Sequence, residues 1–176
     1  MTLRFATYKS GRKAKTRLRP RLRRGKKEVN KLKQLVVTLE GYYAKLPALP
    51  LGARDFLVSI TPWLALVFGV LMVLFSALGL LGGAVLSPFA AAAGTSGLTV
   101  LLMATAVLGI AEGVLMVAAF SPLKKRLMKG WMLLFWVEVL QVVGAVLTLN
   151  IGSVVWGVLG AAIGLYFLFQ IKSYYK

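Results

Sequence analysis

Four long apolar runs occupy most of this chain between residues 62 and 171. A transmembrane helix needs about 20 predominantly apolar residues to cross a hydrocarbon core of about 30 Å. Because lipid offers the backbone no hydrogen-bond partners, each spanning run must form a helix. The sequence therefore predicts an all-α polytopic membrane protein with four transmembrane helices, at about 62–86, 97–120, 130–149 and 151–171.

Proline and small polar residues predict where these helices begin and end. Thr is a favourable N-cap and Pro suits the first helical position, so the first span is expected to begin at Thr61-Pro62. Ser87-Pro88 is expected to end it and to open an uncharged loop over 87–96. A tight turn at Asn150 is expected to lead into the last span.

The basic residues are distributed unevenly along the chain. The net charge is +17, and 14 of the 22 Lys and Arg residues lie within residues 1–33. The 121–129 loop and the C-terminus are also basic, whereas 87–96 and 150–152 carry no charge. Cytoplasmic loops carry an excess of Lys and Arg, so both termini are predicted to face the cytoplasm of a bacterial inner membrane. Trp63 and Trp131 are expected to anchor the helices at that interface.

Composition divides the chain into three regions. Residues 1–27 combine like charges with little hydrophobic periodicity, which predicts a disordered cytoplasmic tail. The same segment is rich in hydroxyls and lacks acids, as an organelle transit peptide does, so a bacterial or organellar source stays open. Residues 28–50 are expected to form an amphipathic interfacial helix followed by a Pro linker. Residues 51–176 form the predicted bundle, built as two tandem hairpins.

The basic side chains are expected to bind anionic lipid or a protein partner. Each Lys or Arg near the membrane surface contributes about 1 kcal/mol to that attraction. Contact with nucleic acid or the ribosome is an alternative, although without interleaved aromatic residues it would be unspecific. The residues concerned are Arg12, Lys13, Lys15, Arg17, Arg19, Arg21, Arg23, Arg24, Lys26, Lys27, Lys124, Lys125, Arg126 and Lys129.

The chain contains neither Cys nor His. The usual ligands of zinc, haem and copper are therefore missing, and so are the Ser-His and Cys-His pairs of nucleophilic catalysis. We expect no metal, no cofactor and no enzymatic activity.

Glycine spacing predicts close helix packing and an internal repeat. The segments VLGIAEG at 107–113 and VLGAAIG at 158–164 agree at five of seven positions, and each follows a span that opens on Trp. Small residues let helix backbones approach in lipid. The residues expected to act in this way are Gly109, Gly113, Gly157, Gly160 and Gly164, either within the bundle or between copies in a homo-oligomer.

Two acids, Glu112 and Glu138, lie inside the predicted spans. Each stands eight residues from the cytoplasmic end of its span, a depth of about 12 Å. The two carboxyls could face each other, with Gln141 on the face of Glu138 as a hydrogen-bond partner. Intramembrane acids are functional candidates. The alternative is that each acid is structural, either neutral or directed toward the basic loop.

Residues Trp63, Gly69, Pro88, Gly109 and Gly113 resemble the repeat of HdeD-like bacterial acid-resistance membrane proteins. That family also uses a Trp-led helix, a Pro-containing outer loop and a Gly-rich return helix. It commonly has six spans, whereas this chain has four and a long basic tail. The segment from Lys129-Gly130-Trp131 to the ending IGLYFLFQIKSYYK also resembles small uncharacterised four-span bacterial proteins. Neither resemblance implies an activity.

Together these patterns favour a non-enzymatic membrane scaffold or accessory subunit, which engages anionic lipid or a protein partner through its basic arm and could belong to a homo-oligomer or a larger membrane complex. The alternative is a small oligomeric transporter or channel that uses Glu112 and Glu138.

Overall fold

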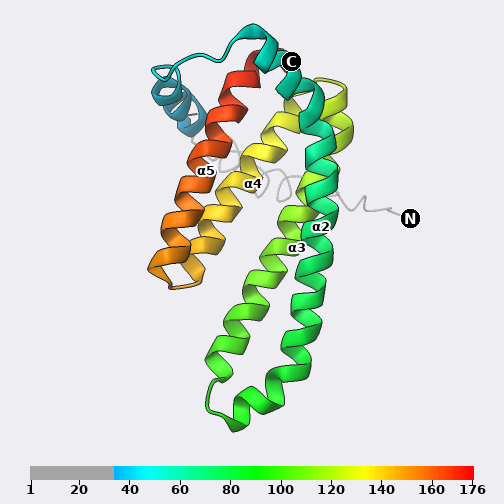
Figure 1. The fold of residues 1–176 in the computed structure, drawn as a ribbon, viewed down its shortest axis with the longest axis vertical. Helices are drawn as coiled ribbons and strands as arrows, with labels where there is room; N and C mark the ends of the chain where they lie inside the picture. The colour runs from blue at the N-terminus through cyan, green and yellow to red at the C-terminus, as the bar shows by residue number, and fades with distance from the viewer. Residues whose placement is uncertain (1–33) are drawn as a thin grey trace, which may run out of the picture. The chain divides into compact units, whose positions relative to one another are not determined.

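The structure is a computed structural model that describes residues 34–176. Residues 34–43 are helical, and residues 47–50 have no regular secondary structure. The long helices that follow are α2 (Leu51–Ala92), α3 (Ser96–Lys124), α4 (Met128–Leu147) and α5 (Ile151–Ile171), and a 3-10 turn, η1 (Lys172–Tyr174), ends the chain (Figure 1). Among the described residues there is no strand. The chain divides into two compact units, Met1–Pro47 and Ala48–Lys176.

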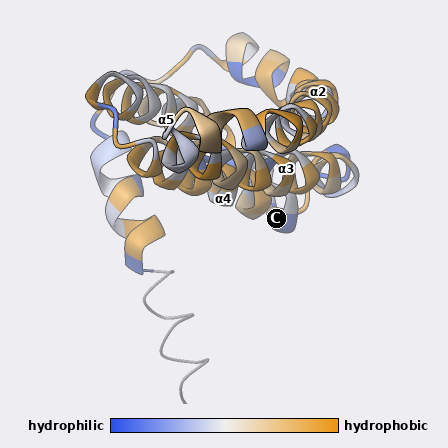
Figure 2. Ribbon diagram, turned by 90° about the horizontal axis from the view of Figure 1, so that it is seen from below, coloured by the Kyte–Doolittle hydropathy of each residue, from blue (hydrophilic) through white to orange (hydrophobic). Residues whose placement is uncertain are grey.

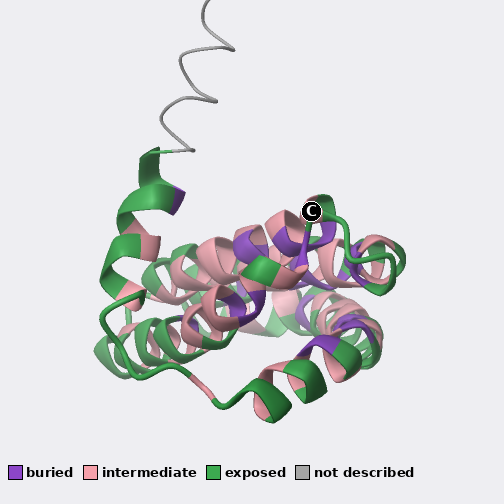
Figure 3. Ribbon diagram, turned by 90° about the horizontal axis from the view of Figure 1, so that it is seen from above, coloured by how far each residue is buried: buried purple, intermediate pink, exposed green. Residues whose placement is uncertain are grey.

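The four helices α2 to α5 are each long and apolar enough to cross a membrane. The 20 residues of α4 correspond to about 30 Å, the thickness of the hydrocarbon core. Most of the ribbon of the long helices is hydrophobic (Figure 2), and many of their residues are exposed (Figure 3). Large apolar side chains are numerous among the exposed residues. Such a surface suits lipid and not water. The chain is therefore a multi-pass membrane protein.

The first long helix is longer than the prolines predicted. α2 runs through Pro62 and Pro88 without a break, so the expected start at Thr61-Pro62 and the expected end at Ser87-Pro88 are both wrong. Proline is tolerated inside transmembrane helices because neighbouring helices, Ser or Thr side chains, ordered water or local adjustments of the helix can satisfy the backbone groups that it frees. The Thr61 hydroxyl does not cap the helix and instead donates to the Leu57 carbonyl at 2.6 Å.

The predicted 87–96 loop shortens to a turn for the same reason. α2 ends in a Schellman motif, in which the amide of Thr95 donates to the Ala90 carbonyl at 2.8 Å and that of Gly94 to Ala91 at 3.1 Å. Gly94 has a φ of +71°, a conformation that glycine adopts without strain. α3 then begins at Ser96.

The basic loop is also shorter than expected. α3 continues through Pro122 to Lys124, which leaves residues 125–127 before α4. Arg126 takes the left-handed position of a second Schellman motif, with the Leu127 amide donating to the Pro122 carbonyl at 2.9 Å. The last turn agrees with its prediction: the Asn150 side chain accepts from the amides of Gly152 and Ser153 at the start of α5.

Consecutive helices pack side by side: α2 on α3, α3 on α4, and α4 on α5. The side chain of Leu108 lies level with Gly144, close to the end of α4. The first part of α3 and its partner segment of α2 therefore continue past the α4–α5 turn, as Figure 1 shows.

The C-terminus is fixed at the end of the bundle that carries the basic loop. The Lys176 amide donates to the Arg126 carbonyl at 3.0 Å, and the Met128 amide donates to the Lys176 carbonyl at 2.6 Å. Tyr175, between these bonds, is 3% exposed. The start of α2 is held at the same end, because the Leu49 amide donates to the Gln170 side chain at 3.3 Å.

Candidate functional site

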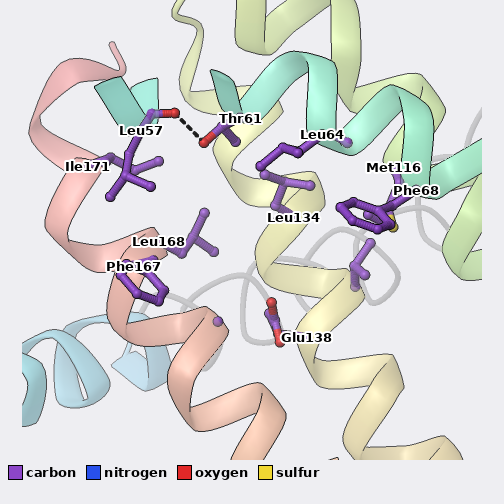
Figure 4. A pocket seen from close by; sticks show the side chains of 13 residues that line it. Leu57, Thr61, Leu64, Phe68, Met116, Leu134, Glu138, Phe167, Leu168 and Ile171 are labelled. Atoms are coloured by element: carbon purple, nitrogen blue, oxygen red, sulfur yellow. Dashed lines mark hydrogen bonds between the residues drawn. The ribbon is translucent and has the colours of Figure 1, made fainter. Parts of the chain in front are cut away.

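A pocket of about 200 Å³ lies between the helices on the basic-loop side of the bundle. Its walls come from all four long helices and are almost entirely apolar, with Leu57 and Phe68 from α2, Met116 from α3, Leu134 from α4 and Phe167 from α5 (Figure 4). Two polar side chains also line it: the hydroxyl of Thr61, which already donates to Leu57, and the carboxyl of Glu138.

Glu138 is the charged side chain of this pocket. It lies on α4, ten residues after the helix begins, and points into the space between α4 and α5 (Figure 4). Its Oε2 atom is buried and has no hydrogen-bond partner. An ionised carboxylate without a partner in apolar surroundings is strongly disfavoured, so this oxygen calls for a proton or a cation.

Gly164 on α5 makes room for this carboxyl. A Cβ atom at Gly164 would lie 2.6 Å from the Glu138 carboxyl carbon and 2.7 Å from Oε2. One turn away, a Cβ at Gly160 would lie 3.1 Å from Nε2 of Gln141, and a Cβ at Gly157 would overlap Ala145. The three glycines predicted to pack helices thus line the contact between α5 and α4.

The structure does not place Gln141 between the two acids. Its side-chain amide lies over Gly160, on the α5 side of α4. Glu112 faces a different contact: it is 4% exposed, and its Oε1 lies 3.9 Å from the Cβ position of Gly144, between α3 and α4. The two acids therefore line different helix contacts, Glu138 against α5 and Glu112 against α4.

Gly109 and Gly113 belong to the contact between α2 and α3. A Cβ at Gly113 would lie 2.7 Å from the Gly69 carbonyl oxygen and 2.9 Å from the Val73 amide nitrogen. The neighbouring position, Gly109, is covered by the Ser76 side chain. The backbones of α2 and α3 therefore lie close together at Gly69 and Gly113.

Trp131 does not anchor the bundle at the membrane surface, and that prediction is wrong. Its side chain is completely buried, and its indole N–H donates to the Leu168 carbonyl at 2.7 Å. It stacks on Phe135 and meets Phe169 edge to face, at 5.7 and 5.4 Å between ring centroids. The indole fills the space between α4 and α5. A buried indole N–H usually requires an acceptor, and the Leu168 carbonyl supplies it here.

Trp63 is half exposed, and Lys124 lies over its ring at 5.3 Å. Lys172 covers Trp131 in a similar way at 5.5 Å. Each contact joins a Trp of one helix, α2 or α4, to a Lys at or just after the end of the next, in a cation–π arrangement.

The described basic residues predicted to bind lipid are all exposed: Lys124, Lys125, Arg126 and Lys129. The ten tail residues from Arg12 to Lys27 lie outside the described part of the chain, as does the beginning of the predicted amphipathic helix.

Sequence reasoning missed the contribution of the first turns of α2 to the pocket. The expected start of the first span at Thr61-Pro62 leaves Leu57 outside the span and gives Thr61 the role of its cap, whereas both residues lie inside α2 and line the pocket. The sequence does contain a signal: Ser59 and Thr61 lie three residues and one residue before Pro62, and both hydroxyls donate to carbonyls of the preceding turn.

No protein family, curated protein or solved structure matches this chain.

Proposed function

We propose that this chain is a non-enzymatic scaffold or accessory subunit of the bacterial inner membrane, with both termini in the cytoplasm. Its basic segments would engage anionic lipid or a protein partner. The supporting observation is the segregation of charge along the bundle axis. Exposed Lys and Arg residues gather where Lys176 meets Arg126, whereas the turns at 93–95 and 148–150 carry no charge. This pattern matches the positive-inside bias of cytoplasmic loops.

We further propose that the bundle consists of two tandem hairpins, α2–α3 and α4–α5, related by an internal repeat. The glycine spacing at 109–113 and 160–164 supports this, because each pair packs against the preceding helix. The paired contacts of Lys124 with Trp63 and of Lys172 with Trp131 support it independently.

Lipid retention tests the scaffold proposal. The full chain is purified from bacterial membranes, and the ratio of anionic to zwitterionic lipid that remains bound is measured by native mass spectrometry. Replacing the ten tail Lys and Arg residues by Gln is expected to lower this ratio at least threefold, because each neutralised charge removes about 1 kcal/mol of attraction. A variant with all ten positions as Arg keeps the charge and should retain the wild-type ratio. Equal ratios in all three proteins would contradict the lipid proposal.

Orientation is testable because the chain has no Cys. Single Cys residues placed at Lys125 and at Thr95 should react with an impermeant maleimide from opposite sides of the membrane. Labelling of Thr95→Cys, and not Lys125→Cys, in intact spheroplasts is the expected result.

A second candidate function is a small transporter or channel, and the unpartnered Oε2 of Glu138 in its pocket favours it. The test is flux through proteoliposomes that contain the wild-type chain or the double variant Glu112→Gln with Glu138→Gln. Loss of flux with retained helicity supports this candidate. Equal flux in the two proteins removes it.

A further inference from the structure

We propose that the pocket beside Glu138 binds a small lipophilic ammonium ion. An N–H group of the ligand would donate to the Glu138 carboxylate, and its apolar body would lie among the lining side chains. This ligand class would be the substrate of the transport candidate. Only the physiological use of the site rests on that candidate, because the pocket can bind a ligand that the protein does not transport.

The first step is the need of Glu138 for a positive partner. Its Oε2 is buried without a hydrogen bond. Lys129, the nearest cation along the chain, is exposed, and the ammonium groups of Lys124 and Lys172 lie over the rings of Trp63 and Trp131. A mobile cation with an N–H group would supply both the charge and the hydrogen bond that the carboxylate lacks.

The second step excludes a bare metal ion as this partner. Calcium and magnesium take six or more oxygen ligands, and transition metals favour imidazole or thiolate. Within residues 34–176, no three carboxylate, His or Cys side chains gather in one place. One carboxylate and one hydroxyl that is already donating cannot replace the hydration shell of a metal ion, whereas an organic ammonium needs only a single acceptor.

The third step concerns access and size. Leu64, Phe68 and Phe167 line the pocket and are still 41%, 55% and 40% exposed, so the pocket opens between α2 and α5 toward the lipid-facing surface. A ligand that enters there first dissolves in hydrocarbon and must be lipophilic. The volume of about 200 Å³ is smaller than the roughly 300–1,000 Å³ of a drug-sized site. A short arylalkylamine fits these conditions.

Equilibrium binding of radiolabelled 2-phenylethylamine tests the proposal. The full chain is embedded in nanodiscs of zwitterionic phosphatidylcholine, and uptake by empty nanodiscs is subtracted. We expect saturable binding of one ligand per chain. Glu138→Gln keeps the side-chain shape, removes the charge and should weaken binding at least tenfold. Glu40→Gln removes a carboxylate outside the bundle and should bind within twofold of wild type. Unlabelled 2-phenylethanol, which has no ammonium group, should fail to compete.

Absence of saturable binding by the wild-type chain would overturn the proposal, as would wild-type affinity in Glu138→Gln. If Glu138→Gln does not fold, the double variant Leu64→Trp with Phe167→Trp enlarges two exposed rim residues and leaves Glu138 intact. It should also bind at least tenfold more weakly, and wild-type affinity would overturn the proposal. Binding with no flux in proteoliposomes would remove the transport candidate and keep the site, so the two ideas fail separately.

Discussion

The carboxyl group of Glu138 on α4 lies directly over the backbone of Gly164 on α5. A side chain at residue 164 would occupy the space that the acid fills, within 2.6 Å of its carboxyl carbon. The close contact of the two helices and the direction of Glu138 toward the pocket therefore depend on the same glycine. This glycine belongs to a stripe that packs helices, so the polar site and the packing cannot be changed independently.

Gly164→Ala is expected to destabilise the protein by about 1–3 kcal/mol, the usual range for overpacking. The added methyl group would force Glu138 away from α5 or push the helices apart. Thermal unfolding in detergent, followed by circular dichroism, measures the effect. The matched control is Gly82→Ala in α2, where no atom lies within 4 Å of the new Cβ. That variant should be as stable as wild type or gain up to about 1 kcal/mol of helix propensity. Equal stability of the two variants would contradict the packing at Gly164.

Gly113→Ala should destabilise the contact between α2 and α3 by at least as much. Its Cβ would meet backbone atoms, the Gly69 oxygen at 2.7 Å and the Val73 nitrogen at 2.9 Å, and backbone cannot move aside as a flexible side chain can. Gly79→Ala is the control on α2, because its Cβ would lie at an ordinary 3.8 Å from Ala106. The loss of unfolding free energy is measured by denaturation in mixed micelles. A Gly113→Ala protein as stable as Gly79→Ala would show that the helices are farther apart.

Trp131→Phe should lower the free energy of unfolding by about 1–3 kcal/mol, since it removes a buried hydrogen bond and leaves a small gap. The bond lost is the one from the indole to Leu168, at 2.7 Å. Trp156→Phe makes the same chemical change on an exposed face, where Trp156 is 76% exposed, and should alter stability by less than about 0.5 kcal/mol. Both variants can be compared by thermal unfolding. A similar small effect in the two proteins would mean that Trp131 is an interfacial residue after all.

The burial of the Tyr175 hydroxyl predicts that the protein loses stability at alkaline pH. Burial raises the pKa of its hydroxyl above the ordinary value, and the nearby charge of Arg126 lowers it by less. In the unfolded chain the hydroxyl ionises near pH 10, while in the folded chain it keeps its proton to higher pH. The unfolded state thus binds fewer protons above pH 10, so stability falls as pH rises.

Tyr175→Phe removes this titration. The stability of this variant should decline less between pH 9 and 11 than that of wild type. Some decline should remain, because the Lys residues titrate in both proteins. The Tyr175 hydroxyl is also buried without a hydrogen-bond partner, so the variant should be no less stable at pH 7. Parallel pH curves for the two proteins would contradict the burial of this hydroxyl.

The number of long helices and the position of α5 were predictable from the sequence, because in lipid each helix must satisfy its own backbone locally. The apolar run at 151–171 and the expected turn at Asn150 together specify a helix that the structure reproduces at both ends. The bounds of α2 were not predictable in this way. The prolines at 62 and 88 are helix-ending signals in the sequence, but in the structure the helix continues through both.

Which face each intramembrane side chain presents was decided only by the tertiary structure. The sequence placed Glu112 and Glu138 on neighbouring helices at similar depth, yet one lies against Gly144 and the other against Gly164. Likewise, Trp131 starts its helix as Trp63 starts its span, but Trp131 is buried and Trp63 is exposed. In apolar helices almost every face is compatible with lipid, so composition does not set their rotation. Close approach at a few glycines sets it, and that approach exists only once two helices have met.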